Sequence, residues 1–108
     1  MGTPGGGTAV RVLLVEDHPD IAEVTLLMLR HLGAEAEHAA TARQALDLGR
    51  SQSFDLLLAD MRLPDGTGLD VIRELAPAGP RPVLLTAYGA SETLPGDGDG
   101  LTYERLTK

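Results

Sequence analysis

The sequence predicts an α/β fold, a doubly wound parallel sheet with helices on both faces. The first observation is a set of short apolar runs without alternation, such as residues 56–59 (LLLA), which is typical of strands buried on both faces. The second is that these runs alternate with segments whose apolar residues recur at helical spacing. The connections between them are short, and the order βαβαβαβ favours parallel pairing.

Length and composition set the outer bounds. A chain of 108 residues with 43% hydrophobic residues is long enough for one domain with a buried core. Residues 1–9 are rich in Gly and Thr, and we expect a disordered tail there, with the domain over residues 10–108. The net charge of −7 argues against direct binding to nucleic acid, which requires a basic face.

The expected location is the cytoplasm. The sequence has no cysteine and therefore no disulfide framework or thiol chemistry. No apolar run approaches the ~20 residues of a membrane span. The first residues, MGTPGGGTA, lack the basic and apolar regions of a signal peptide.

The first half of the chain contains two strands and one long helix. Residues 10–15 predict a strand that ends in the acidic pair Glu16 and Asp17, and a helix is expected from about residue 19 to 32, with Gly33 as its stop. Residues 34–39 alternate weakly and predict a second strand, of the kind found at a sheet edge.

The expected first helix is apolar over about twice the ~100° arc of an ordinary surface helix. One face holds Ile21, Val24, Thr25, Met28 and Leu32, and an extra stripe holds Ala22, Leu26 and Leu29, with Leu27 at the other edge. An uncovered stripe of this kind marks an interface. We therefore expect the stripe Ala22, Leu26, Leu29 to be covered by a second copy of the chain or by the helices of a partner.

The second half continues the alternation. Thr41 is the expected cap of a helix, with Gln44 three residues later completing a capping box. Residues 54–59 form the third expected strand, a third helix turns Leu69, Ile72, Leu75 and Ala76 inward, and residues 83–85 form the fourth strand. Residues 89–100, rich in Gly, are expected to be mostly non-helical, and residues 103–107 predict a last strand.

Polar side chains follow the ends of these strands. Glu16 and Asp17 end the first strand, and Asp60 ends the third; Thr86 and Lys108 follow the fourth and fifth. The carboxyl ends of parallel strands share one sheet edge, where α/β folds place their chemistry. Crowded carboxylates repel unless a hard cation such as Mg²⁺ intervenes. With an ammonium and a hydroxyl nearby, the set is suited to phosphoryl transfer onto an aspartate.

Over residues ~10–108 the chain resembles the receiver domains of two-component response regulators. The resemblance is carried by LLVEDHPD, by the D-x-x-L-P-x-x-x-G run from Asp60 to Gly68, by LTAYG around Thr86, and by LTK at the end. It implies a flavodoxin-like fold, with a five-stranded sheet in the order 2-1-3-4-5. LPDGTGLD and LTAYG look most like the receiver domains of hybrid sensor kinases.

Carried over by position, the resemblance makes Asp60 the phosphoacceptor. It implies that Mg²⁺ is held by Glu16, Asp17 and Asp60 together with the backbone carbonyl of Arg62, and that Thr86 and Lys108 bind the phosphoryl group. The implied partner is a histidine kinase or a histidine phosphotransfer domain. Such a domain is a signalling module that at most catalyses its own phosphorylation and dephosphorylation.

The sequence departs from the family in three ways. Arg105 occupies the position of the family's switch aromatic, and Tyr103 lies two residues earlier on the same side of the strand. The family's fourth helix falls in residues 89–100, and a fifth helix is absent because the sequence ends at Lys108. We expect either a domain truncated after its fifth strand or an altered output.

Two alternatives remain. A phosphorylation-independent interaction module is favoured by Arg105 and by residues 89–100. A phosphatase with an aspartyl intermediate would need a second aspartate two residues after Asp60, where this chain has Arg62. The three histidines, His18, His31 and His38, are expected at the surface.

Overall fold

The computed structural model describes residues 9–86 and 104–107, with the side chains of Thr86, Arg105 and Thr107 left out. Five parallel strands form one sheet in the order β2-β1-β3-β6-β7. The strands are β1 (Arg11–Val15), β2 (Glu35–Ala39), β3 (Leu56–Asp60), β6 (Arg81–Thr86) and β7 (Glu104–Thr107). This order matches the expected 2-1-3-4-5, so the predicted fold is confirmed.

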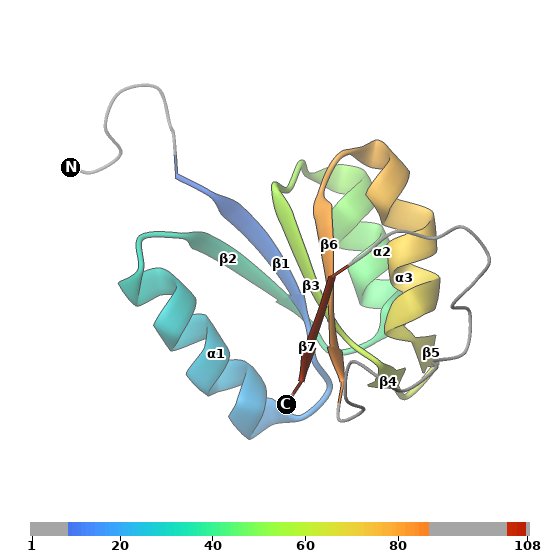
Figure 1. Ribbon diagram of the computed structural model, residues 1–108, viewed down its shortest axis with the longest axis horizontal. Coiled ribbons are helices and arrows are strands. Elements are labelled where there is room, and N and C mark those ends of the chain that lie inside the picture. The colour runs from blue at the N-terminus through green and yellow to red at the C-terminus, as the bar shows by residue number, and fades with distance from the viewer. Residues whose placement is uncertain (1–8, 87–103, 108) are drawn as a thin grey trace.

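Helices cover both faces of the sheet (Figure 1). Helix α1 (Pro19–His31) lies on one face, and α2 (Ala42–Ser51) and α3 (Gly68–Leu75) lie on the other. Each face has its own apolar core, and alternate residues of one strand serve the two cores: Leu13 and Val15 face α2 and α3, whereas Val12 and Leu14 face α1. The strands therefore read as continuous apolar runs because both of their faces are buried.

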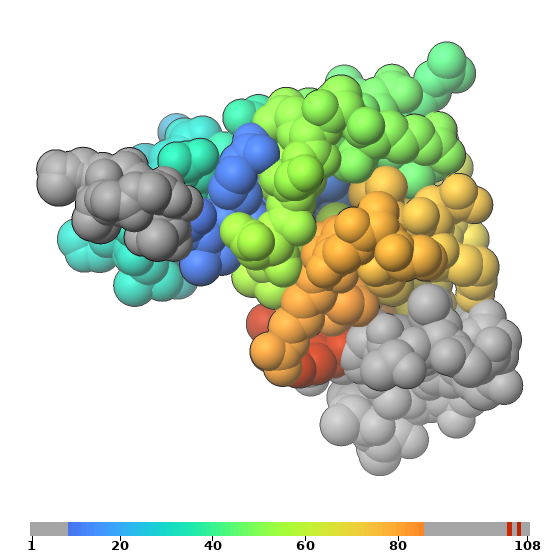
Figure 2. Space-filling model, turned by 90° about the horizontal axis from the view of Figure 1, so that it is seen from above, coloured from blue at the N-terminus to red at the C-terminus, as the bar shows by residue number. Residues whose placement is uncertain are grey.

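The strands begin at one end of the molecule, which Figure 2 shows from above with β1 in blue and β6 in orange. Near this end, the ion pair between Arg81 and Glu104 joins the first residues of β6 and β7. The guanidinium of Arg11 lies 5.1 Å from the centre of the Phe54 ring, a cation–π contact. These contacts stabilise the edge of the sheet where the strands start. The polar residues that follow the strand ends lie at the opposite edge.

Helix α1 has the predicted limits, within one residue. Pro19 occupies its first turn, where a missing N–H costs nothing. Gly33 follows its end with a φ of +93°, in the left-handed region that glycine adopts without strain. The N–H groups of Gly33 and Ala34 donate to the carbonyls of Arg30 and Leu29 and satisfy the last turn.

The expectation about which stripe of α1 is left uncovered is wrong. Ala22 is 2% exposed, and Leu26 and Leu29 pack against the apolar core on this face of the sheet. Exposed instead are Ile21, Val24, Leu27, Met28 and Leu32, at 42–79%. Both stripes repeat at helical spacing, so periodicity could not choose between them; the small side chain of Ala22 lets the helix approach the sheet on that side.

The connection after β3 contains a small antiparallel hairpin that the sequence pattern did not predict. Its strands, β4 (Arg62–Leu63) and β5 (Gly66–Thr67), have two residues each, too few to show a period of two. Asp65, at the turn, accepts hydrogen bonds from the N–H groups of Ala42 and Arg43, at 2.7 and 3.1 Å. The hairpin therefore caps the first turn of α2 from outside that helix.

Helices α2 and α3 begin with side-chain caps. In α2 the Thr41 hydroxyl accepts from the Gln44 N–H as predicted, but the Gln44 side chain accepts from Ala40 and not from Thr41. In α3 both bonds of a capping box form between Thr67 and Asp70. The predicted inward residues Leu69, Ile72 and Leu75 of α3 are buried, which confirms the third helix.

Strand limits differ from the expected ones by a few residues. The third strand begins at Leu56 and not at residue 54; Phe54 lies before the strand and is buried. The fourth strand covers residues 81–86 and includes Pro82. A short 3₁₀ turn, η1 (Ala76–Ala78), precedes it. Within the described ranges, none of the helices has both the length and the apolar character needed to cross a membrane.

Several expectations lie outside the described residues. They are the disordered tail, apart from residue 9, the non-helical character of residues 89–100, and the positions of Tyr103 and Lys108. The last strand is present as β7 over Glu104–Thr107, and the residue expected to start it, Tyr103, lies outside the described residues.

Candidate functional site

The register of the sheet places the predicted site residues at one edge. Val15, the last residue of β1, pairs with Ala59 of β3, so Glu16 and Asp60 follow side by side. Asp60 in turn pairs with Leu85, which precedes Thr86. Thr86 pairs with Thr107 at the end of β7. The ends of four strands, β1, β3, β6 and β7, therefore lie at one edge of the sheet.

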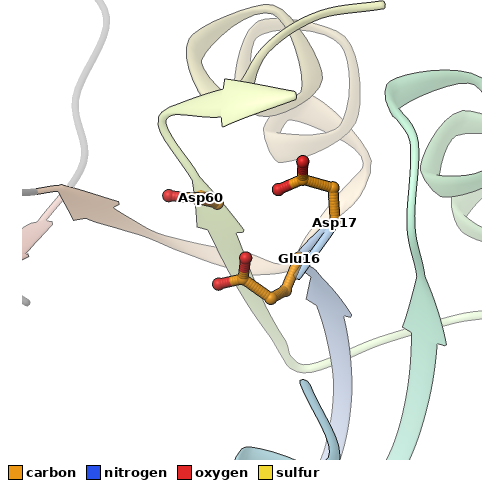
Figure 3. Close-up of side chains that lie close together, drawn as sticks. All are labelled: Glu16, Asp17 and Asp60. Atoms are coloured by element: carbon orange, nitrogen blue, oxygen red, sulfur yellow. The ribbon is translucent and has the colours of Figure 1, made fainter. Parts of the chain in front are cut away.

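Three carboxylates converge at this edge. Oxygens of Glu16, Asp17 and Asp60 lie within 4.8 Å of one another. Figure 3 shows the three side chains close together at the ends of β1 and β3, with the carboxylates of Glu16 and Asp17 directed toward Asp60. Glu16 and Asp60 are 1% and 6% exposed, whereas Asp17 is exposed. The cluster is therefore buried on two sides and open to solvent through Asp17.

Backbone and side-chain hydrogen bonds hold Glu16. Its N–H donates to the carbonyl of Ala39 at 3.0 Å, which extends the β1–β2 ladder by one residue. Its carboxylate Oε2 accepts from the N–H of His18 at 3.1 Å. Its carbonyl oxygen lies 2.7 Å from Nε2 of His38. The turn between β1 and α1 is thereby fixed to β2, the edge strand beside β1.

The chain around Asp60 is fixed from the other side. The N–H of Met61 donates to the Leu85 carbonyl, and the N–H of Gly68 donates to the Met61 carbonyl, both at 2.9 Å. A Cβ on Gly68 would lie 2.2 Å from the backbone oxygen of Asp60, closer than any real contact. The helix α3 can start beside Asp60 only because residue 68 has no side chain.

The donor set fits a hard divalent cation. Bringing three carboxylates this close is unfavourable, because the charges repel and two of them are removed from water. A cation with oxygen ligands relieves both costs, and Mg²⁺ is usually bound through one or two carboxylates and keeps several waters. The opening at Asp17 leaves room for such waters or for phosphoryl oxygens.

The remaining predicted residues are placed less fully. Arg62 begins β4, two residues after Asp60; metal contact through its carbonyl stays a prediction. Thr86 ends β6 at the same sheet edge as the three carboxylates, but its side chain is not among the described ones. Lys108 lies outside the described residues. Arg105 is placed only as a backbone position in β7, opposite Leu84.

Sequence reasoning missed the role of His38 in this turn. It was expected at the surface, but it is half-buried and contacts the Glu16 carbonyl. A signal was present: in a strand, residue 38 shares a face with the buried Ala36. His18, by contrast, is exposed at the start of α1, as expected.

Comparison with known proteins gives the same assignment. The sequence profile of the response regulator receiver domain matches residues 12–95. Response regulator protein PilR of Pseudomonas aeruginosa is 39% identical over 85 residues, which are 77% of this chain and 19% of PilR. The aerobic respiration control sensor protein ArcB of Escherichia coli is 42% identical over 73 residues, 68% of this chain and 9% of ArcB. The chain therefore spans less than a fifth of these relatives.

The ArcB match gives only weak support to a likeness with hybrid sensor kinases, because PilR, a response regulator, matches over more of the chain. Among solved structures, response regulator TrrA of Thermotoga maritima, in complex with Mg²⁺-BeF, superposes with a TM-score of 0.79 and 29% identity, over 92% of this chain and 86% of that one. With the sheet order, the converging carboxylates and the profile match in agreement, the chain belongs to the response regulator receiver domain family.

Proposed function

We propose that Asp60 accepts a phosphoryl group from a phosphohistidine protein in a Mg²⁺-dependent reaction. The observation that carries the proposal is the convergence of Glu16 and Asp17 on Asp60 within 4.8 Å. The family is a phosphoacceptor family of two-component signalling, and no observation in the described residues favours an interaction module that is independent of phosphorylation. The similar TrrA structure contains Mg²⁺.

In the proposed step a carboxylate oxygen of Asp60 attacks phosphorus. The bond between phosphorus and the imidazole nitrogen of the donor breaks as the new P–O bond forms. The imidazole nitrogen keeps the electron pair of the broken bond and takes up a proton from solvent. The product on this chain is an aspartyl phosphate, and the donor regains a neutral histidine.

The residues around Asp60 have separate proposed roles. Glu16 and Asp17 would hold the Mg²⁺ ion together with Asp60 and the Arg62 carbonyl, and the ion would neutralise charge on the phosphoryl oxygens. Thr86 and Lys108 would bind the oxygens that face β6 and β7. The hydrogen bonds at Glu16 and Gly68 hold the acceptor and the acidic pair in register.

Receiver domains interact with histidine kinases or phosphotransfer proteins, and α1 offers a surface for that contact. The helix begins two residues after Asp17, and its exposed apolar residues Val24, Leu27 and Met28 continue away from the site. Exposed apolar side chains in one patch mark protein contacts. We place the helices of the phosphodonor there, in place of the stripe Ala22, Leu26, Leu29, which the sheet covers.

The test is labelling by acetyl phosphate in the presence of Mg²⁺. The intact mass should rise by one phosphoryl group, and chelation by EDTA should prevent the change. An Asp60→Asn variant should take up none, whereas Asp47→Asn, an exposed carboxylate on α2, should be labelled like the wild type. Equal labelling of the Asp60→Asn variant would remove Asp60 from the role.

A further inference from the structure

We propose that His38 is a positioning residue for the metal site. Its imidazole holds the peptide group between Glu16 and Asp17, so that the Asp17 carboxylate is presented to Asp60. The inference rests on the proposed Mg²⁺ site and assigns a function to a side chain outside the acidic cluster.

The contact itself is a hydrogen bond with one possible direction. Nε2 of His38 lies 2.7 Å from the backbone oxygen of Glu16. A carbonyl oxygen only accepts, so Nε2 must carry the proton and donate. At 2.7 Å the distance lies at the short end of the normal range for N–H···O bonds.

The position of His38 allows this hydrogen bond to hold the turn that follows β1. His38 lies near the end of the edge strand β2, opposite Leu14, and reaches past Val15 to the residue after β1. His38 is half-buried and lines one hollow together with Pro19, Ala22 and Leu26 of α1. Partial burial restricts the rotamers of its side chain, so the hydrogen bond is made with less loss of freedom than at a fully exposed position.

The consequence for Asp17 follows from the planarity of the peptide bond. The carbonyl of Glu16 and the N–H and Cα of Asp17 lie in one plane, so fixing the oxygen fixes the direction in which the chain enters Asp17. Asp17 is exposed and belongs to neither β1 nor α1. The direction of its side chain is therefore set by this peptide, which His38 holds from β2.

Holding the peptide also opposes repulsion within the cluster. Without a cation, the carboxylate of Asp17 is pushed away from Glu16 and Asp60, which are buried and cannot retreat. The exposed residues Asp17 and His18 are the part of the site that can move outward. A bond from the neighbouring strand keeps the site open at the spacing a cation needs, the role that outer partners have at many metal sites.

The experiment compares Mg²⁺ affinity in three histidine variants of the full chain. His38→Leu removes the donor and keeps an apolar side chain of similar size; His38→Gln keeps an amide N–H at about the same reach. His31→Leu alters an exposed histidine at the end of α1 and is the matched control. Binding is followed by calorimetry and by the amide shift of Asp17 in ¹H–¹⁵N spectra.

We expect the Mg²⁺ dissociation constant to rise about tenfold in His38→Leu, the loss typical of outer-partner removal, and to return to within about twofold of wild type in His38→Gln. His31→Leu should bind like the wild type. Equal affinities in His38→Leu and wild type, or an equal loss in the Leu and Gln variants, would overturn the positioning role. A wild type that binds no Mg²⁺ would overturn the proposed site itself.

A measurement on the wild type covers the case in which His38→Leu does not fold. The ¹⁵N shifts of the His38 ring report which nitrogen carries the proton. Protonated Nε2 supports the bond to Glu16, and the tautomer with the proton on Nδ1 alone would contradict it.

Discussion

Gly68 is a residue beside the site at which there is no room for a side chain. Its missing side chain leaves room for the backbone of Asp60 and for Leu84, and a Cβ there would lie 2.2 Å from the Asp60 oxygen and 2.9 Å from Leu84 Cδ1. Gly68→Ala must therefore shift backbone and not merely a side chain. We expect a loss of about 1–3 kcal/mol in the free energy of unfolding, measured by urea denaturation, and slower labelling of Asp60.

Gly66→Ala, two residues earlier in β5, is the control. A Cβ at Gly66 would lie 3.2 Å from Asp70 Oδ2 and 3.8 Å from Ala42 Cβ, so the Asp70 side chain need shift by only a few tenths of an ångström and no backbone atom is displaced. The expected loss is below about 1 kcal/mol, because the capping-box bond from the Thr67 N–H to Asp70 Oδ2 is perturbed but not removed. Equal losses in the two variants would show that the space around the Asp60 backbone is not what limits residue 68.

Single residues also show what the sequence could predict about the site. Glu16, Asp17 and Asp60 were predictable, because each directly follows a buried apolar run and parallel strands end at a common edge. His38 and Asp65 were not, because their partners lie 22 and 23 residues away in the sequence. Neighbouring residues do not identify these partners, although the position of His38 on the same strand face as Ala36 indicates partial burial.

Asp65 links two elements, the β4–β5 hairpin and α2. Its carboxylate accepts from the N–H groups of Ala42 and Arg43, and these bonds hold its pKa below the ordinary value of 3.8. The folded state therefore binds this proton less readily than the unfolded chain does. Asp65 contributes stability above the unfolded pKa and loses it as the pH falls through the folded pKa.

The lowered pKa of Asp65 predicts how the effect of removing its carboxylate depends on pH. Asp65→Ala should unfold at a lower urea concentration than the wild type at pH 7, because α2 loses its external cap. The difference between the two midpoints should shrink as the pH is lowered below about 4, where the wild-type carboxylate becomes protonated. A difference that stays constant from pH 7 to pH 3 would mean that the charge of Asp65 has no part in it.

Helix α1 presents two apolar faces with different partners. Leu26 packs against the sheet, whereas its neighbour Leu27 is 62% exposed. Leu26→Glu would place a carboxylate in the apolar layer and should cost about 3 kcal/mol or more. Leu27→Glu should change the free energy of unfolding by less than about 0.5 kcal/mol, and both are read from urea denaturation.

The same pair tests the proposed docking surface. With the fold intact, Leu27→Glu should slow transfer from a phosphohistidine protein by about tenfold, the effect of one lost interface contact. Labelling by acetyl phosphate, a small molecule that needs no such surface, should not change. If Leu27→Glu changes transfer from the phosphohistidine protein and labelling by acetyl phosphate to the same extent, the donor does not contact this face of α1.

At the scale of the whole molecule, the sequence was sufficient to predict the architecture but not which face of α1 packs against the sheet. Four apolar runs at successive strand positions and three helical patterns predicted the layers, and the resemblance supplied the strand order, which the structure confirms. The buried face of α1 could not be predicted, because Ala22, Leu26, Leu29 and the exposed stripe have the same period. The β4–β5 hairpin was missed because strands of two residues leave no pattern.

The hairpin between Asp60 and α3 has a consequence for how this chain can vary in length. It is fixed at three points, through Met61 to β6, through Asp65 to α2 and through Gly68 to Met61. An added or deleted residue there would break at least one of these attachments and misplace the backbone of Asp60. The turn at Gly79, with a φ of +131°, lies at the opposite end of the strands and has no such ties to the site. Of these two connections, the turn at Gly79 is therefore the one where an insertion or deletion should leave the backbone of Asp60 in place.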